Sequence, residues 1–345
     1  ESDESEHGKD VVGTTLEHCT ISYGGRVGIF ALGDKFTLRN SKISDTSTEG
    51  VYILSSNDVL LEKNILTRNN IENITGYYPA AVKIFNQSHR VVVNDNLVTE
   101  QPNSNGIWYD VGNVDGVFTN NWLENVGNLE RTIKGGRVWP SRNAFFFEIS
   151  KGIKVTSNVF LNNDQGMLIL NASGAKIYNN TFINSMAVIA RDRRGENQDH
   201  FGWHIRTGPG VQERTNHEFH NNLLVGDSDF ERPLLYVWQL PNMCEQFQTP
   251  SLTQLDHNAY VKLNKNDAPV IWMAQKLNSE CINAFKGSNE LHQANSDYAS
   301  NSVSLINYEG PLFKSMDLKN FELLKDFEAK KINSANVGAF SNSRK

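Results

Sequence analysis

Short segments in which apolar and polar residues alternate recur along most of the chain. Alternation with a period of two predicts β-strands, because successive side chains of a strand point to opposite faces. The segments are FTLRNSKI, VLLEKNIL, VVVNDNLV, GVFTNNWL, IKVTSNVF, KIYNNTFI and EFHNNLLV. When they are aligned, an asparagine occupies one column, at intervals of 24, 32, 25, 37, 22, 42 and 36 residues. These asparagines are Asn40, Asn64, Asn96, Asn121, Asn158, Asn180, Asn222 and Asn258, with Cys19 in the same place in the first unit.

A second strand is predicted between successive asparagines, in VGIFAL, GVYILS, AVKIFN, GIWYDV, AFFFEI, GMLILN and AVIARD. Several short strands per turn, with a polar ladder, indicate an all-β chain folded as a right-handed parallel β-helix. One coil cannot bury its own apolar face, whereas stacked coils share a core. Inward asparagines can satisfy backbone groups that would otherwise be buried without a partner. The alternative is a β-sandwich, whose strands also alternate but which predicts no asparagine column.

The repeat divides the chain into three parts. Residues 1–10 read as a disordered or truncated acidic stretch, 11–260 as the β-helix, and 261–345 as a cap packed on its end. Three long insertions, at 68–80, 125–143 and 191–217, lead into or out of the second strand column. Since loops of a solenoid map to particular faces, we expect these insertions to form walls around a cleft on one face.

Composition narrows the function. No apolar run approaches the ~18 residues of a membrane span, and a net charge of −6 gives no general attraction to nucleic acid. The chain starts at Glu1 without a signal peptide, so we expect a processed protein or a fragment. Cys244 and Cys281 could pair in an oxidising compartment, but we favour all three cysteines, with Cys19, as unpaired packing residues.

Two carboxylates occupy matching places on successive strands of the second column. Alternation sends Asp110 and Glu148 outward, beside Trp108 and Phe146, with Lys83 on the preceding coil. The other outward positions are Phe85, Leu168, Leu170, Ile189 and Arg191, and the inward ones are Val82, Ile84, Ile107, Tyr109, Val111, Phe145, Phe147, Ile149, Met167 and Ile169.

The spacing of the two carboxylates suits one reaction. Parallel strands lie ~4.8 Å apart, so we expect the carboxyl groups roughly 5 Å apart, which fits a retaining glycosidase at about 5–5.5 Å better than an inverting one at about 6.5–9.5 Å. Either carboxylate alone would read as a solvated surface residue. The register of the two, the aromatic neighbours and the surrounding insertions favour an active site.

The segment GIWYDV…VFTNNWLENV…FFFEISKGIKVTSNVF resembles the β-helix β-xylosidases of glycoside hydrolase family 120, and related β-helix glycosidases such as family 141. The similar stretch covers roughly residues 80 to 226. Carried over residue by residue, the resemblance implies that Asp110 is the nucleophile and Glu148 the acid/base. It departs after Glu148, where Ile149 and Ser150 precede Lys151, whereas the xylosidases carry a histidine before the glycine.

Further residues are candidates for substrate contact. Lys83 could bind substrate or hold Asp110 ionised, and Arg191 could act in the same way from the other side of the column. In the segment DHFGWH, His200, Trp203 and His204 could contact a sugar, pack within their loop, or form part of a metal site. We favour sugar contact and predict no metal and no cofactor.

These observations predict a secreted or periplasmic, exo-acting, retaining glycoside hydrolase. Its partner would be a carbohydrate, from a plant-type or other complex polysaccharide or oligosaccharide, and no oligomeric state is predicted. One alternative is a uronate lyase that uses Lys83 or Arg191 as base, with Ca²⁺ held by Asp110 and Glu148. A non-catalytic glycan-binding or tailspike-like β-helix is the other.

Overall fold

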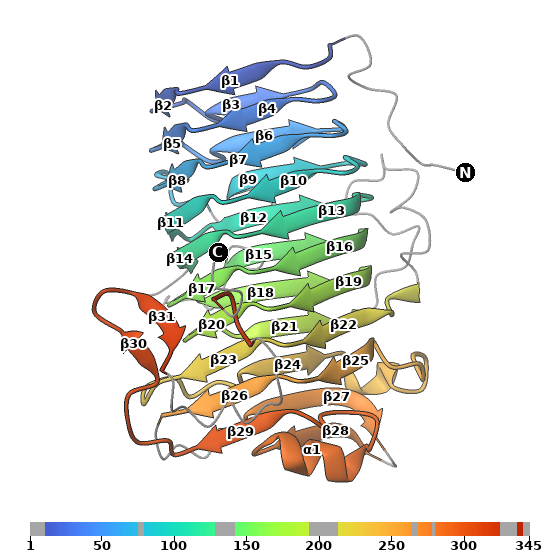
Figure 1. Ribbon diagram of the computed structural model, residues 1–345. Helices are drawn as coiled ribbons and strands as arrows, with labels where there is room; N and C mark the ends of the chain where they lie inside the picture. The colour runs from blue at the N-terminus through green and yellow to red at the C-terminus, as the bar shows by residue number, and fades with distance from the viewer. Residues whose placement is uncertain are drawn as a thin grey trace.

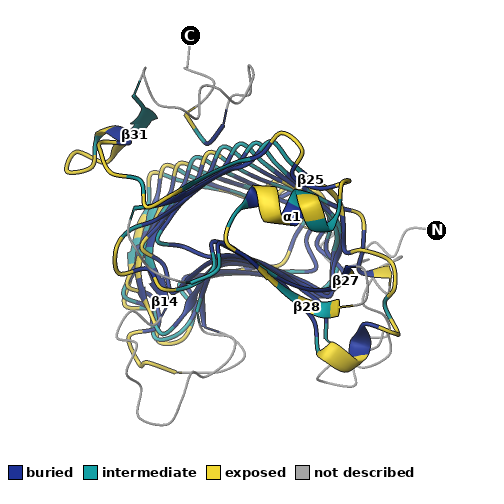
Figure 2. Ribbon diagram, turned by 90° about the horizontal axis from the view of Figure 1, so that it is seen from below, coloured by how far each residue is buried: buried dark blue, intermediate teal, exposed yellow. Residues whose placement is uncertain are grey.

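The protein is a stack of coils in a right-handed parallel β-helix, as the alternation predicts (Figure 1). The computed structural model describes residues 11–74, 79–127, 142–192, 213–263, 268–277, 280–324 and 337–340. In these residues three long sheets run along the stack, and strands of one sheet are joined in sequence through the other two. Figure 2, which looks along the stack, shows the three sheets around a common core.

Each sheet takes one strand from each coil, except at the C-terminal end of the third sheet, where two consecutive strands pair antiparallel. The first sheet consists of β1 (Thr15–Glu17), β4 (Thr37–Arg39), β7 (Leu60–Glu62), β10 (Val92–Asn94), β13 (Val114–Thr119), β16 (Lys151–Thr156), β19 (Ser173–Tyr178), β22 (His217–His220) and β25 (Leu252–Asp256). The second consists of β2 (Thr20–Ser22), β5 (Lys42–Ser44), β8 (Ile65–Thr67), β11 (Leu97–Pro102), β14 (Trp122–Gly127), β17 (Val159–Leu161), β20 (Thr181–Ile183), β23 (Leu223–Gly226), β26 (Ala259–Lys262) and β29 (Val303–Ile306). The third consists of β3 (Ile29–Ala31), β6 (Val51–Leu54), β9 (Ala80–Phe85), β12 (Asn105–Asp110), β15 (Asn143–Glu148), β18 (Gln165–Leu170), β21 (Ala187–Ala190), β24 (Leu235–Trp238), β27 (Ile271–Leu277) and β28 (Glu280–Phe285).

The asparagine ladder links the coils from inside. The Asn96 backbone N–H donates to Asn121 Oδ1 at 3.0 Å, the Asn121 N–H donates to Asn158 Oδ1 at 2.9 Å, and the Asn158 N–H donates to Asn180 Oδ1 at 3.1 Å. Each buried amide thereby satisfies a backbone group of the neighbouring coil, which would otherwise lose a hydrogen bond without water to replace it.

One member of the predicted ladder is wrong. Ser41, not Asn40, pairs with the next coil, because its N–H donates to Asn64 Oδ1 at 3.0 Å. Asn40 has a φ of 50° and is the turn residue before the ladder position. Asparagine suits both places, since it tolerates the left-handed region that most residues avoid. The ladder also runs one coil further than predicted, from the Asn258 N–H to Ser302 Oγ at 3.1 Å.

Most residues that were predicted to point inward from the third sheet form the core, but three positions differ from the prediction. Tyr109, Phe145 and Phe147 are fully buried and pack edge to face at about 6 Å between ring centroids. Val111 and Ile149 were expected inward, but their φ angles of 58° and 47° break the alternation, so they pack in a separate cluster with Phe85, Tyr52 and Leu54. Ile189 was expected outward but pairs with the core residue Ile169 and is buried in the core.

The C-terminal part extends the β-helix beyond the predicted boundary and also packs on its outer face. β27 and β29 belong to the parallel sheets, so the solenoid extends past residue 260. The short helix α1 (Ser288–Ala294) lies across the end of the stack (Figure 2). The hairpin of β30 (Phe313–Ser315) and β31 (Asn320–Leu323) turns back to the outer face of the second sheet. There Phe321 stacks on Trp122 at 5.6 Å between centroids, and Lys319 binds Glu124 at 2.6 Å.

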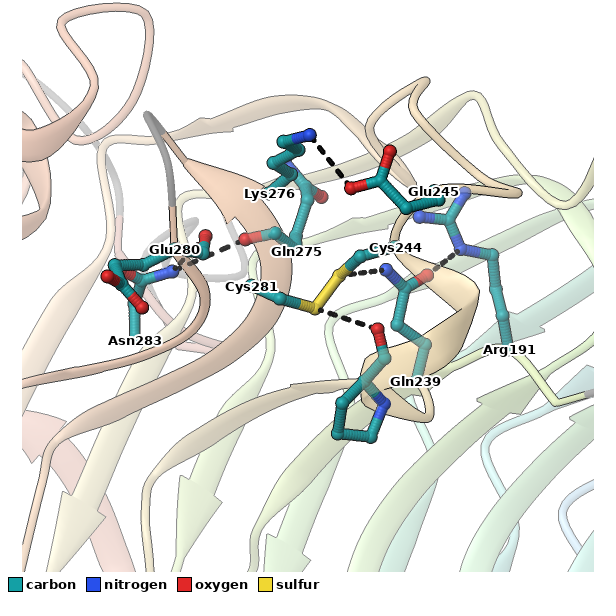
Figure 3. Close-up of a disulfide and its surroundings, with 10 residues drawn as sticks. Arg191, Gln239, Cys244, Glu245, Gln275, Lys276, Glu280, Cys281 and Asn283 are labelled. Carbon is teal, nitrogen blue, oxygen red and sulfur yellow. Dashed lines mark hydrogen bonds and ion pairs between the residues drawn. A yellow bond between two sulfur atoms is a disulfide. The ribbon is translucent and has the colours of Figure 1, made fainter.

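Two of the cysteines form a disulfide, contrary to our preferred interpretation. Cys244 and Cys281 are joined with their Cα atoms 6.1 Å apart (Figure 3). The bond ties the turn that contains the 3₁₀-helix η2 (Pro241–Met243) to β28. Cys19 is free. The pairing was missed because 37 residues separate the two cysteines, and only the coil geometry brings them together.

Candidate active site

Three neighbouring strands of the third sheet bring the predicted residues together. Asp110 on β12 pairs in register with Glu148 on β15, and Trp108 pairs with Phe146 two residues earlier. Lys83 on β9 pairs with Trp108 from the other side. The five side chains therefore occupy adjacent outward positions on consecutive coils, as the alternation predicts.

The ends of these strands are held by polar side chains that sequence reasoning did not single out. At the carboxyl ends, the Ser88 N–H donates to Asn113 Oδ1 at 3.0 Å and the Asn113 N–H donates to Ser150 Oγ at 3.1 Å. At the amino ends, Asn143 Nδ2 donates to Asn105 Oδ1 at 3.0 Å. These contacts fix the register that aligns the two carboxylates. A signal existed, since a serine or asparagine follows each of these strands within two or three residues.

The outward face is buried here, which the sequence did not predict. Asp110 is 6% exposed and Glu148 2%, and Lys83, Trp108 and Phe146 are equally enclosed. Each of the strands β9, β12 and β15 has six residues, and all of them are buried. Two buried carboxylates are not ordinary surface groups, since charges removed from water need partners.

Lys83 is the partner of Asp110. Its Nζ lies 2.6 Å from Asp110 Oδ2 and 2.9 Å from the centroid of the Trp108 ring. Burial lowers the pKa of Lys83, while the charges of Asp110, Glu148 and Glu49 act in the opposite direction. The ammonium group is therefore enclosed by a carboxylate and an aromatic face, both of which attract a cation.

Trp108 and Phe146 form the aromatic part of the site. Their rings stack with centroids 4.9 Å apart and an interplanar angle of 18°. The indole Nε1 of Trp108 is buried and has no hydrogen-bond partner within the described residues. A buried indole N–H usually has an acceptor, so this donor is available to a ligand.

Arg191 is not brought to the carboxylate pair. It follows β21, two strands beyond β15 in the third sheet, and its side chain is committed to neighbouring groups. Nε donates to Gln239 Oε1 at 3.0 Å (Figure 3), and Nη1 donates to the carbonyl of Thr249 at 2.9 Å. Burial, then the charge of Arg214, lowers the pKa of Arg191 to about 10. Its predicted contact with substrate stays a prediction.

Other predicted features lie outside the described residues. His200, Trp203 and His204 fall within 193–212, and most of the 125–143 insertion falls within 128–141. Within the described ranges, no group of three or more His, Cys, Asp or Glu side chains could hold a metal ion. No helix in the same ranges is long and apolar enough to cross a membrane.

The sequence profile of the family described as "Right handed beta helix region" matches residues 6–182. This protein therefore belongs to that family. No curated protein matches its sequence.

Three solved structures share the architecture. Pectate lyase Pel9A is 16% identical with a TM-score of 0.43, over 62% of this chain and 51% of that one. The complex of XylC with xylose is 15% identical with a TM-score of 0.41, over 68% and 38%. The mannuronan C-5 epimerase AlgE4 A-module of Azotobacter vinelandii is 12% identical with a TM-score of 0.42, over 72% and 58%. The alignments span between about two fifths and three fifths of those chains. The similarity concerns the fold alone.

Proposed function

We propose that this protein is a retaining glycoside hydrolase. The observation that carries the proposal is the register of Asp110 and Glu148 on adjacent parallel strands. Strands of a sheet lie ~4.8 Å apart, and two carboxyl groups about 5–5.5 Å apart are the arrangement that retaining glycosidases use. The substrate class is a complex polysaccharide or oligosaccharide. Exo action, in which a terminal sugar is removed, is part of the proposal because long insertions flank these strands.

The surroundings of the two carboxylates support the roles that we propose for them. Asp110 accepts a charge-assisted hydrogen bond from Lys83, which suits an ionised nucleophile. Asp110 would attack the anomeric carbon, while Glu148 donates a proton to the departing glycosidic oxygen. Glu148 would then take a proton from water, which attacks the anomeric carbon and releases Asp110. The unpartnered Nε1 of Trp108 could donate to a sugar hydroxyl or ring oxygen beside the pair.

Export from the cytoplasm is part of the proposal. The disulfide between Cys244 and Cys281 supports it, because disulfides persist in oxidising compartments and are rare in the cytosol. A secreted or periplasmic location would also place the protein with polysaccharides.

The test combines variants with product analysis. Aryl glycosides, beginning with β-xylosides as the resemblance to family 120 suggests, should be hydrolysed with retention of the anomeric configuration. Asp110→Ala and Glu148→Ala should each lower kcat by at least about 10³-fold, and azide should rescue turnover in one or both. Asp115→Asn is the matched control, because Asp115 lies on β13 of the same coil and is exposed. Wild-type turnover in both alanine variants would rule out this pair as the catalytic groups.

A second candidate rests on Lys83. Because burial lowers its pKa, Lys83 gives up a proton more readily than a surface lysine, as the base of a uronate lyase must. It would remove the proton α to the uronate carboxyl group, and the glycosidic oxygen would leave from the adjacent carbon. An ultraviolet-absorbing unsaturated product from polygalacturonate or alginate, lost on chelation of Ca²⁺, would favour the lyase.

A further inference from the structure

The outer face of the third sheet changes character beyond the candidate site. On β9, β12, β15, β18 and β21 the outward side chains are buried, including Leu168 and Val188, at 6% and 4% exposure. On β24 the outward residues Tyr236 and Trp238 become partly exposed, as does Trp272 on β27. The sheet therefore opens to solvent toward the C-terminal end of the stack, in the lower part of Figure 1.

These three rings form an ordered surface. Tyr236 and Trp272 are register partners on adjacent strands, with ring centroids 4.5 Å apart and an interplanar angle of 39°. Trp238 points to the same side, two residues along β24 from Tyr236. Beyond Trp272 the outward residues of β28 are Ala284 and Ile282, both exposed. We call Tyr236, Trp238 and Trp272 the aromatic platform.

The polar side-chain atoms of the platform have no hydrogen-bond partner among the described residues. Tyr236 Oη, Trp238 Nε1 and Trp272 Nε1 make no hydrogen bond in the part of the chain that the structure describes. A surface of aromatic faces edged by free donors is amphipathic. Tyrosine and tryptophan are enriched at binding surfaces for this reason, because one end is apolar and the other can hydrogen-bond.

Two cations beside the platform are bound to neighbouring groups. Lys276, four residues along β27 from Trp272, binds Glu245 with Nζ 2.9 Å from Oε1 (Figure 3). Arg191 is buried, and its guanidinium group donates hydrogen bonds to Gln239 and Thr249. Lys276 and Arg191 are therefore already engaged by neighbouring groups and do not offer a free positive charge to a phosphate, a uronate or a nucleic acid.

We infer that the aromatic platform is a second carbohydrate-binding site, which takes neutral sugar residues. A pyranose ring offers an apolar C–H face to an aromatic ring and hydroxyl groups at its edge, which matches flat rings edged by free N–H and O–H donors. The position supports this assignment. Tyr236 and Trp272 continue the same outward column as Lys83, Trp108 and Phe146, through Leu168 and Val188.

The aromatic platform and the carboxylate pair lie on the same sheet, a few strands apart. Tyr236 lies three strands from Phe146 in the third sheet, and each strand step is ~4.8 Å. The outward residues of β18 and β21, which lie between them, are buried, so the platform is a surface separate from the carboxylates. Binding at the platform does not depend on the hydrolysis proposed for Asp110 and Glu148.

Affinity electrophoresis of the full chain tests the platform. The gels contain soluble arabinoxylan or galactomannan as neutral probes, and polygalacturonate as the acidic comparison. The wild type should be retarded by at least one neutral polysaccharide. Tyr236→Ala and Trp272→Ala should each weaken that binding about fivefold to tenfold, whereas Trp272→Phe should keep most of it. Tyr23→Ala is the matched control, because Tyr23 is a surface tyrosine of the first coils, 78% exposed.

Two further readouts separate this inference from the proposed function. Asp110→Asn should bind the polysaccharide as the wild type does, and the platform variants should hydrolyse small aryl glycosides normally. Binding without any hydrolysis would leave the platform in place and remove the hydrolase. The inference is overturned if no neutral polysaccharide retards the protein, or if only polygalacturonate does. It is also overturned if the platform variants bind like the wild type, or if they convert a dimer into a monomer in sedimentation.

Discussion

Lys83 and Asp110 form a buried ion pair across two adjacent coils, with Nζ 2.6 Å from Oδ2. The two residues are 27 positions apart in the sequence. Their side chains are only 1% and 9% exposed, so neither charge can exchange its partner for water. The pair therefore couples the fold of the third sheet to the chemistry proposed for Asp110.

Lys83→Met should damage both stability and activity. It leaves the Asp110 carboxylate buried without its partner, and breaking such a pair by removing one side typically costs about 3–5 kcal/mol. Urea denaturation should show this loss, and it should be partly recovered in the double variant Lys83→Met/Asp110→Asn, which carries neither charge. Lys154→Met on β16 is the control, since Lys154 is exposed. Equal stability of Lys83→Met and wild type would contradict the ion pair.

The asparagine ladder should be a main source of stability. Asn158 Oδ1 accepts from Asn121, while its Nδ2 donates to the Phe118 carbonyl at 3.0 Å and to Asn180. Asn158→Ala should lower the free energy of unfolding by about 2–4 kcal/mol, because buried backbone groups of two coils lose partners. Asn179→Gly is the control at the neighbouring turn position, where φ is 56° and glycine is tolerated. A similar loss in both variants would argue against the ladder.

His217 should make the fold sensitive to acid. It is buried on β22, accepts a hydrogen bond at Nδ1 from the Ala175 N–H, and burial, then the charge of Arg191, lowers its pKa from 6.5 to about 3. Between these values the unfolded chain binds a proton that the folded chain does not. Stability is therefore complete above about pH 6.5 and decreases as the pH falls toward 3, by about 5 kcal/mol at most.

The slope of unfolding free energy against pH measures this effect. His217→Asn should flatten the slope between pH 6.5 and 4, although it lowers stability at neutral pH by disturbing a buried hydrogen bond. The control His18→Asn changes a histidine whose side chain is 73% exposed, and should leave the slope as it is. A wild-type slope in His217→Asn would assign the acid sensitivity to other groups.

The disulfide should stabilise the C-terminal coils. Cys244→Ser/Cys281→Ser should lose about 2–4 kcal/mol, since the bond closes a loop of 37 residues. Reduction with dithiothreitol should lower the melting temperature of the wild type and of Cys19→Ser, but not of the double variant. An unchanged melting temperature after confirmed reduction would show that the bond contributes nothing.

Much of the fold could be predicted because strand alternation and the ladder are local patterns repeated many times. Asn64 and Asn96 could be aligned from their neighbours alone, and the register of Asp110 with Glu148 followed from that alignment. The failures occurred where two local rules compete. Asparagine is favoured both at the turn and in the ladder, so Asn40, a turn residue, was placed in the ladder. The left-handed backbone at Val111 and Ile149 interrupted an alternation that continued in the sequence.

What could not be predicted depends on contacts between coils. The Lys83–Asp110 distance and the enclosure of Glu148 depend on side-chain conformations, and the pairing of Cys244 with Cys281 depends on the path of the chain between coils. Sequence spacing gives neither. The aromatic platform was missed for the same reason, because Tyr236 and Trp272 are 36 residues apart and become neighbours only as register partners.

Trapping the covalent intermediate tests the central claim most directly. The protein would be incubated with the 2-deoxy-2-fluoro analogue of the aryl glycoside that it hydrolyses fastest, then digested and examined by mass spectrometry. We predict a single glycosylated peptide with the sugar on Asp110, and no labelling in Asp110→Ala. A label on another carboxylate, or hydrolysis that inverts the anomeric configuration without any label, would contradict Asp110 as nucleophile of a retaining pair.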